Sequence, residues 1–304
     1  MSFEAFALQP QTLDEAYAQD HARAALEHEQ WPDFNNTYYS ARLILDAADL
    51  AIQHKADDGT PSRALILGAG AQRSVSIGTL AKKFDEVVIV DRYEPGLDAA
   101  LAEIERADAF FAKHPEADAS YLTRHKMRAI TADLSYGLAD GVTAAARQAL
   151  GIASDFDAYT NLFSRLAATT TAHAFPKLDG PYDFVSSHHL VSEMVRVPQQ
   201  WCENMAAAEY GKEEMYPDSM ALHSLVFSSL RKRLLPEHMA DLVAQTKPGG
   251  VIQISDENLD MLPAAPVTPL VEGTSWALTK PDAFVQPRLR SHTVQVDLPV
   301  DTPR

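Results

Sequence analysis

Cysteine, positive charge and long apolar runs are all scarce in this chain of 304 residues. The one cysteine, Cys202, allows neither an intrachain disulfide nor a cysteine-based metal cluster, which favours a reducing compartment. Lysine and arginine number 26 against 42 acidic residues, so the net charge is −16. Because so acidic a chain repels phosphate backbones and anionic lipid, the composition predicts no nucleic-acid partner and no membrane partner.

The apolar runs are short, as in Val87 to Val90, and none approaches the roughly 20 residues that a membrane span needs. The first ten residues, MSFEAFALQP, have neither the basic segment nor the apolar core of a secretory signal. We therefore expect a cytoplasmic protein. Hydrophobic residues make up 46% and charged residues 22%, which is ordinary globular composition and enough for a sizeable core.

Short apolar runs alternate with helical stretches along most of the chain. The runs predict strands at residues 63–67, 86–91, 127–133, 182–187 and 251–255. Strands that are apolar throughout are typical of a parallel sheet covered on both faces. The sequence therefore predicts an α/β fold with an open, mostly parallel, doubly wound sheet. Residues 291–298 alternate in polarity and predict a late antiparallel edge strand.

The domain organisation follows from where the helical stretches lie. Residues 1–60 are helical in pattern and predict an N-terminal helical cap, and residues 61–304 predict the α/β domain. Two crossovers, at about 137–180 and 192–221, are longer than one helix requires. Insertions of this size commonly build a substrate pocket, a lid or an oligomer contact.

The first expected strand ends in Gly68-Ala69-Gly70, and the second ends in Asp91, about 20 residues later. Glycine permits a sharp turn and a close ligand, and a carboxylate can accept hydrogen bonds from both hydroxyls of a ribose. This spacing is typical of nucleotide sites, although a structural turn and a solvated strand end remain alternatives. Arg73 stands where the dinucleotide fingerprint needs a small residue.

With Lys247-Pro-Gly-Gly250 before the fifth strand, residues 60–258 resemble the class I S-adenosylmethionine (SAM)-dependent methyltransferases. The resemblance implies SAM as cofactor, with the glycine loop beside its methionine moiety, Asp91 on its ribose and Asp133 at its adenine. The cofactor-binding residues implied in this way are Gly68, Ala69, Gly70, Asp91, Asp133, Leu134 and Ser187.

His188 and His189, at the end of the fourth strand, are the best catalytic candidates, since the resemblance puts that end beside the transferred methyl. An imidazole can remove a proton from the acceptor near neutral pH. Adjacent strand residues face opposite ways, so we expect one histidine to face the cofactor. Glu193 could orient it, and structural roles for all three stay open. We expect no metal site, and Cys202 is interpreted as a buried apolar residue.

The expected function is methyl transfer from SAM to an oxygen or nitrogen of a small-molecule acceptor. The sequence is also compatible with a homo-oligomer. No Asp/Asn-Pro-Pro-Tyr/Phe motif follows the fourth strand, which disfavours adenine or cytosine N-methylation in DNA. Two alternatives remain. One is a non-catalytic methyltransferase-like binding protein, and the other is a nicotinamide-dependent oxidoreductase.

Overall fold

The computed structural model describes most of the chain. Its described residues are 12–30, 37–55, 57, 59–68, 77–114, 123–188, 190–211, 217–256, 267–277 and 286–297. Within these ranges the side chains of 24–30, 37–41, 188, 192–193, 217–219, 256, 267–277 and 286–291 are not described.

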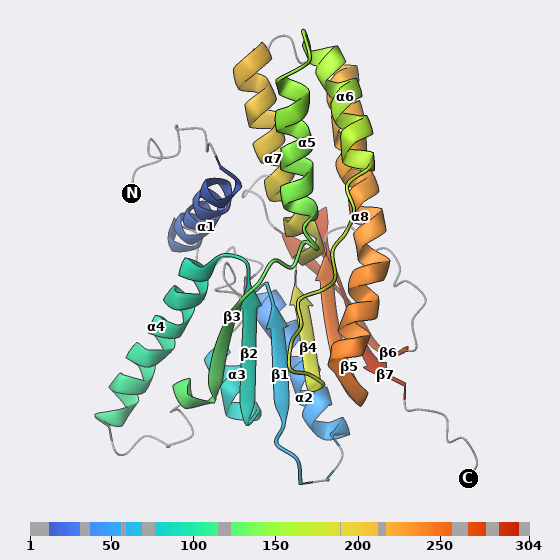
Figure 1. Cartoon of the computed structure of the whole chain (residues 1–304). Coiled ribbons are helices and arrows are strands. Elements are labelled where there is room, and N and C mark those ends of the chain that lie inside the picture. Colours follow the sequence, from blue (N-terminus) through green and yellow to red (C-terminus); the bar gives the residue numbers. More distant parts are fainter. Residues whose placement is uncertain are drawn as a thin grey trace, which may run out of the picture. The chain divides into compact units, whose positions relative to one another are not determined.

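Helices and strands alternate as the sequence predicts (Figure 1). The helices are α1 (Leu13–Gln30), α2 (Thr37–His54), α3 (Ile77–Lys83), α4 (Glu94–Ala112), α5 (Leu138–Leu150), α6 (Phe156–Ala168), α7 (Leu190–Tyr210) and α8 (Pro217–Gln245), with a short 3₁₀ turn, η3 (Arg124–Lys126). The strands are β1 (Arg63–Leu67), β2 (Glu86–Asp91), β3 (Met127–Thr131), β4 (Tyr182–His188), β5 (Thr246–Asp256), β6 (Val267–Ala277) and β7 (Gln286–Val296).

One sheet of seven strands runs in the order β3-β2-β1-β4-β5-β7-β6. Strands β1 to β5 pair in parallel, and β7 is antiparallel to both β5 and β6. The predicted fold class, an open and mostly parallel α/β sheet, is confirmed. β1 and β2 span the predicted residues, because each is a continuous apolar run with polar or turn residues at both ends.

The carboxyl-terminal part of the sheet differs from the expectation in two ways. β7 is antiparallel as predicted, but it lies between β5 and β6, so β6 and not β7 forms the edge. β5 begins at Thr246, so residues 247–250 lie within the strand instead of before it. Thr246 pairs with Tyr182 and Val251 with Phe184, which leaves residues 247–250 opposite Asp183 as a bulge. Strand order and bulges depend on long-range pairing, which a local pattern does not report.

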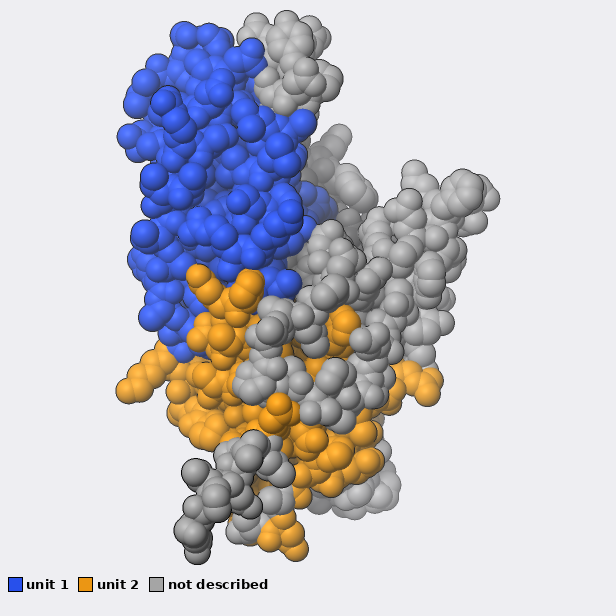
Figure 2. Space-filling view, turned by 90° about the vertical axis from the view of Figure 1, so that its right-hand side faces the viewer, with its two compact units in different colours: residues 1–24, 133–176, 191–235 blue, residues 25–132, 177–190, 236–304 orange. Residues whose placement is uncertain are grey.

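The chain divides into two compact units, each built from several segments, which Figure 2 colours blue and orange. The helical unit comprises residues 1–24, 133–176 and 191–235, and the sheet unit comprises residues 25–132, 177–190 and 236–304. Within the sheet unit α2 packs against β4 and β5. The division into a cap of residues 1–60 and a domain of residues 61–304 stays a prediction.

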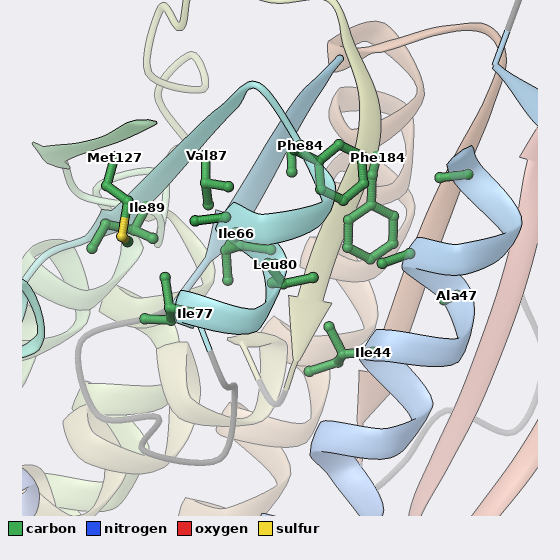
Figure 3. Packing of buried hydrophobic residues seen from close by; sticks show 14 of the residues in the cluster. Ile44, Ala47, Ile66, Ile77, Leu80, Phe84, Val87, Ile89, Met127 and Phe184 are labelled. Carbon is green, nitrogen blue, oxygen red and sulfur yellow. The ribbon is translucent and has the colours of Figure 1, made fainter. Parts of the chain in front are cut away.

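The core of the sheet unit lies where α2 and α3 cover one face of the central strands (Figure 3). Ile44, Ala47, Ala48 and Ala51 form the buried stripe of α2 at three- and four-residue spacing, as the sequence pattern predicts. Phe84 stacks on Phe184 of β4, with ring centroids 5.8 Å apart. Burying one side chain of this size contributes about 1.5–3 kcal/mol, so this layer is a main source of the unit's stability.

The helical unit has an aromatic core of its own. Tyr159 and Phe163 of α6 stack on one another, and His223 of α8 stacks on Phe163 with ring centroids 4.9 Å apart. The guanidinium of Arg147, on α5, lies 4.9 Å from the ring of Trp201 on α7. Cys202 is fully buried, which confirms its interpretation as a core residue, and burial raises the pKa of its thiol.

Among the helices that the structure describes, none combines the length and apolarity needed to cross a lipid bilayer. The cytoplasmic location stays a prediction.

Candidate functional site

The sheet has a point where the direction of chain progression reverses. From β1 the chain moves outward through β2 to β3, and it then returns to the other side of β1 to form β4 and β5 (Figure 1). In open α/β sheets, ligands bind outside the carboxyl ends of the strands at such a reversal. The topology of the sheet unit therefore directs attention to the ends of β1, β2 and β4.

At the end of β1 the chain turns at Gly68, whose φ is +74°. This left-handed conformation is accessible to glycine without the steric penalty that a Cβ would bring. The Gly68 N–H donates a hydrogen bond of 2.9 Å to the carbonyl of Val90, next to the end of β2. The turn is thereby tied to the neighbouring strand. Ala69 and Gly70 lie outside the described residues.

Asp91 ends β2 and is only 9% exposed, so it is not a solvated strand end. Its Oδ1 accepts a 2.8 Å hydrogen bond from the N–H of Tyr93, and its carbonyl accepts one of 2.9 Å from Ala132. A carboxylate offers about four acceptor positions, so it can accept more than one hydrogen bond at a time. The Asp91 side chain fits a group that presents a pair of hydroxyls.

Ser187, near the end of β4, makes a contact that sequence reasoning missed. Its hydroxyl lies 2.7 Å from Nε2 of His238 on α8, and both side chains are buried. Burial lowers the pKa of His238 to about 4, so the imidazole is neutral at pH 7. A signal existed, because His238 lies four residues from both Leu234 and Leu242 on the buried stripe of the helix. Ser187 thus anchors α8 on the sheet.

Next to it, the Ser186 hydroxyl donates a 2.7 Å hydrogen bond to Oε1 of Gln253 on β5, and the Gln253 amide donates to Ser255. These three side chains are at most 1% exposed. The hydrogen bond between Ser186 and Gln253 therefore links the carboxyl ends of β4 and β5, and the bond to Ser255 extends this link along β5.

The three catalytic candidates follow this network in the sequence. His188 is the last residue of β4, and its backbone pairs with Ser255. Its side chain, the whole of His189 and the side chain of Glu193 lie outside the described residues. The backbone of Glu193 belongs to α7, in the helical unit. Their catalytic roles stay predictions.

Asp133 and Leu134 lie in the helical unit, where Asp133 caps the turn that precedes α5. Its Oδ1 accepts hydrogen bonds from the N–H (3.0 Å) and hydroxyl (2.7 Å) of Ser135, and its Oδ2 accepts one of 2.8 Å from the N–H of Gly137. Leu134 is 3% exposed and packs in the core. The structure thus gives Asp133 a capping role that the sequence analysis missed, and contact with adenine stays a prediction.

The same turn holds a conformational outlier. Tyr136 has a φ of +58°, a left-handed conformation rarely adopted by a side chain of this size. Its carbonyl accepts a 2.7 Å hydrogen bond from the N–H of His173, and its ring packs on Phe175 with centroids 5.7 Å apart. These contacts hold the strained backbone in place.

A cluster of charges occupies the opposite, amino ends of the strands. The guanidinium of Arg128 lies 2.5 Å from the carboxylate of Asp179, which also accepts a 2.6 Å hydrogen bond from the Tyr182 hydroxyl. These two hydrogen bonds lower the pKa of Asp179 to about 2. Because this cluster lies away from the topological reversal, its shifted pKa reflects ion pairing within the fold and marks no active site.

The described residues contain no group of three or more His, Cys, Asp or Glu side chains that could hold a metal ion.

Comparison with known proteins was made by family model, by sequence and by structure. No family model matches this chain. No curated protein matches its sequence.

Solved structures give distant similarities. An rRNA methylase from Streptococcus thermophilus is similar over 83% of this chain and 95% of its own, with 8% identity and a TM-score of 0.36. An rRNA methyltransferase from Streptomyces viridochromogenes is similar over 84% of this chain and 84% of its own, with 14% identity and a TM-score of 0.35. A SAM-bound amino pentose methyltransferase from Micromonospora echinaspora is similar over 80% of this chain and 62% of its own, with 13% identity and a TM-score of 0.29. All three are named as methylases or methyltransferases, but at these TM-scores the similarities assign this chain no activity and no acceptor.

The prediction that excluded nucleic acid as a partner is contradicted by this comparison, since the similar structures include two that are named as an rRNA methylase and an rRNA methyltransferase. The prediction rested on the net charge of −16. A net charge describes the average field of a protein and not the charge of one local surface, so it does not exclude a nucleic-acid partner.

Proposed function

We propose that this protein is a methyltransferase that uses SAM as its methyl donor. The observation that carries the proposal is that Gly68 and Asp91 lie at the ends of adjacent strands at the reversal point of the sheet. The Gly68 N–H bonds to Val90 at 2.9 Å, so the turn after β1 lies directly beside the strand that ends in the buried Asp91 carboxylate. A ribose held at Asp91 would extend toward this turn, where a ligand can approach the backbone closely.

The residues that would hold SAM are those at these strand ends. Asp91 would accept hydrogen bonds from the ribose hydroxyls, the loop from Gly68 through Gly70 would lie along the methionine moiety, and Ser187 would lie near the methyl group. When bound, SAM supplies an electrophilic methyl group on a sulfonium centre. The chain's contribution is to bind it, to orient the acceptor and to exclude water.

For the acceptor, we propose an oxygen or nitrogen atom of a small molecule. Cytosine C5 chemistry in a polynucleotide would need an accessible thiolate, but Cys202 is fully buried and its pKa is raised by that burial. An oxygen or amine acceptor loses a proton as it is methylated, and we assign removal of that proton to His188 or His189. Glu193 would orient the imidazole.

The two alternatives make different predictions. A nicotinamide-dependent oxidoreductase is disfavoured because dinucleotide-binding sheets continue in parallel beyond the fifth strand, whereas here β7 runs antiparallel beside β5. A non-catalytic binding protein would bind the cofactor without turnover. Binding and turnover therefore need separate experiments.

Calorimetry with S-adenosylhomocysteine and with NAD tests the cofactor. We expect S-adenosylhomocysteine to bind, and Asp91→Asn to weaken its binding by about 1–3 kcal/mol through loss of a charged acceptor. Asp98→Asn, an exposed carboxylate of α4, is the matched control and should bind like the unmodified protein. Binding of NAD in its place, or no binding of either ligand, would overturn the proposal.

Transfer of a labelled methyl group from SAM tests the acceptor, with total RNA, DNA and a small-metabolite extract as parallel substrates. We expect the label in the small-metabolite fraction, and label recovered mainly in a polynucleotide would refute the small-molecule acceptor. His188→Ala or His189→Ala should lower kcat by about 10²–10⁴-fold while leaving S-adenosylhomocysteine binding intact. Unchanged turnover in both variants would refute the catalytic assignment and leave the two histidines with structural roles.

A further inference from the structure

Helix α4 lies at the periphery of the sheet unit. It packs against β2 and β3, and β3 is one edge of the sheet (Figure 1). The buried residues of α4 are Gly96, Leu97 and Ile104, and its other residues are partly or fully exposed. One long side of this helix is therefore left uncovered by the part of the chain that the structure describes.

The uncovered side of α4 has the spacing of a helix-pairing surface. Ala99, Glu103, Arg106, Phe110 and the C-cap Lys113 follow one another at intervals of four and three residues, and all five are exposed. Such spacing puts side chains on one stripe of a helix, and it is the pattern by which two helices pack in a coiled coil. These five residues, the α4 stripe, thus have the geometry to receive a second helix.

Phe110 is the apolar anchor of the α4 stripe. It is 58% exposed, and its ring centroid lies 5.6 Å from that of Phe111 and 4.3 Å from that of His114. Nδ1 of His114 lies 2.8 Å from the Phe110 carbonyl, which keeps the imidazole beside the ring. An aromatic ring held by its neighbours loses little conformational freedom on binding, and aromatic residues dominate the energetics of many interfaces. Phe110 is therefore suited to burial against a partner.

The α4 stripe is complementary to itself in both charge and size. Among the described residues neither Glu103 nor Arg106 forms an ion pair. If two α4 helices pair antiparallel about a two-fold axis between residues 104 and 105, Glu103 of each copy faces Arg106 of the other. The same register sets the large ring of Phe110 against the small side chain of Ala99. Both contacts occur twice, once on each side of the axis.

We propose that α4 is a self-association surface, on which two copies of this chain pair with their α4 helices antiparallel. A two-fold contact uses the same surface on both copies, so it requires the self-complementarity that the α4 stripe has. A polyanion or an anionic membrane would be repelled by Glu103, and a basic segment by Arg106 and Lys113. The contact does not depend on the proposed methyl transfer, because the stripe contains none of the residues assigned to the cofactor.

Sedimentation velocity of the full chain between about 1 and 100 μM tests the proposal, since one helix pair is a small interface and should give a micromolar Kd. Phe110→Glu should raise the dimer Kd at least about 10-fold, because it removes both anchors. Leu225→Glu is the matched control, at a residue of α8 that is 63% exposed, and should leave the Kd unchanged. A chain that stays monomeric would overturn the proposal, and so would a dimer that Phe110→Glu leaves intact or that Leu225→Glu weakens equally.

Charge exchange tests the antiparallel register, and it replaces Phe110→Glu should that variant fail to fold. Glu103→Arg alone and Arg106→Glu alone each bring like charges together twice, so each should raise the Kd several-fold. The double variant Glu103→Arg/Arg106→Glu re-forms both pairs with their signs reversed and should restore the original Kd. Single variants without effect, or a double variant that does not restore association, would refute the register. Binding of S-adenosylhomocysteine is measured on the same samples, so that failure of either proposal is recognised separately.

Discussion

The two units differ in how they treat buried polar side chains. In the sheet unit several such side chains are closely paired, as Ser187 is with His238 at 2.7 Å and Asp183 with Lys247 at 2.9 Å, although Gln245 Oε1 is buried without a hydrogen-bond partner. In the helical unit His223 Nδ1 and Trp201 Nε1 are buried without a hydrogen-bond partner. The paired side chains of the sheet unit fix its strands and α8 to one another, whereas these two atoms of the helical unit form no such link.

This difference distinguishes buried polar side chains that stabilise the fold from those whose presence needs another explanation. A paired polar group contributes to stability, and its removal leaves a buried partner unsatisfied. An unpaired group contributes less to the fold, so its presence is more readily explained by a ligand. Substitutions in the two units should therefore separate stability from binding.

The largest expected effect is at Asp183, whose carboxylate accepts hydrogen bonds from the Arg63 N–H at 2.8 Å and from the Lys247 ammonium. Asp183→Ala should lower the free energy of unfolding by about 3 kcal/mol, because it leaves both donors without their buried partner. Urea denaturation followed by circular dichroism measures it. Asp49→Ala, which breaks the exposed ion pair with Lys83, is the control and should lose less than about 1 kcal/mol. Equal losses would show that burial of the pair is unimportant.

A second effect is pH dependence in the sheet unit, from His238. Its pKa is about 4 in the fold, below the value of about 6.5 expected in the unfolded chain, so the unfolded chain binds more protons between these values. The stabilisation is present above about pH 6.5 and is lost as the pH falls toward 4. Between pH 7 and pH 5 the unmodified protein should lose about 2 kcal/mol more than His238→Phe does. His125→Gln, at an exposed position, should keep the full loss, and a His238→Phe profile parallel to the unmodified one would refute the assignment.

The smallest expected effect is the difference in stability loss at pH 7 when the same substitution, histidine to phenylalanine, is made in each unit. His238→Phe removes the 2.7 Å bond to Ser187 and should destabilise the fold by about 2 kcal/mol. His223→Phe keeps the aromatic stacking and removes a 3.5 Å contact to Tyr159 and a 3.8 Å approach to Glu203, so about 1 kcal/mol or less is expected. Thermal and urea denaturation of both variants measure the difference. A larger loss for His223→Phe would reverse the comparison between the units.

The parts of the site that could be predicted from the sequence are those carried by local pattern. Gly68 and Asp91 lie at the ends of adjacent parallel strands, as the spacing between glycine loop and carboxylate indicates. Asp133 was expected at the adenine, but its oxygens cap the turn before α5, a contact with residues two and four positions away that the motif does not report. The hydrogen bond of His238 could not be predicted from a local pattern, because its partner Ser187 is 51 residues away in the sequence.

By itself the sequence determined the periodicity of α2, the bounds of β1 and β2, and the parallel α/β class. These features follow from patterns among neighbouring residues, which set the backbone conformation locally. Tertiary structure alone decided that β7 lies inside the sheet, that residues 247–250 bulge within β5, and that Asp20 meets Arg196 across 176 residues. Such pairings depend on which distant surfaces bury each other, and that choice is made by the packing of the whole unit and not by any segment.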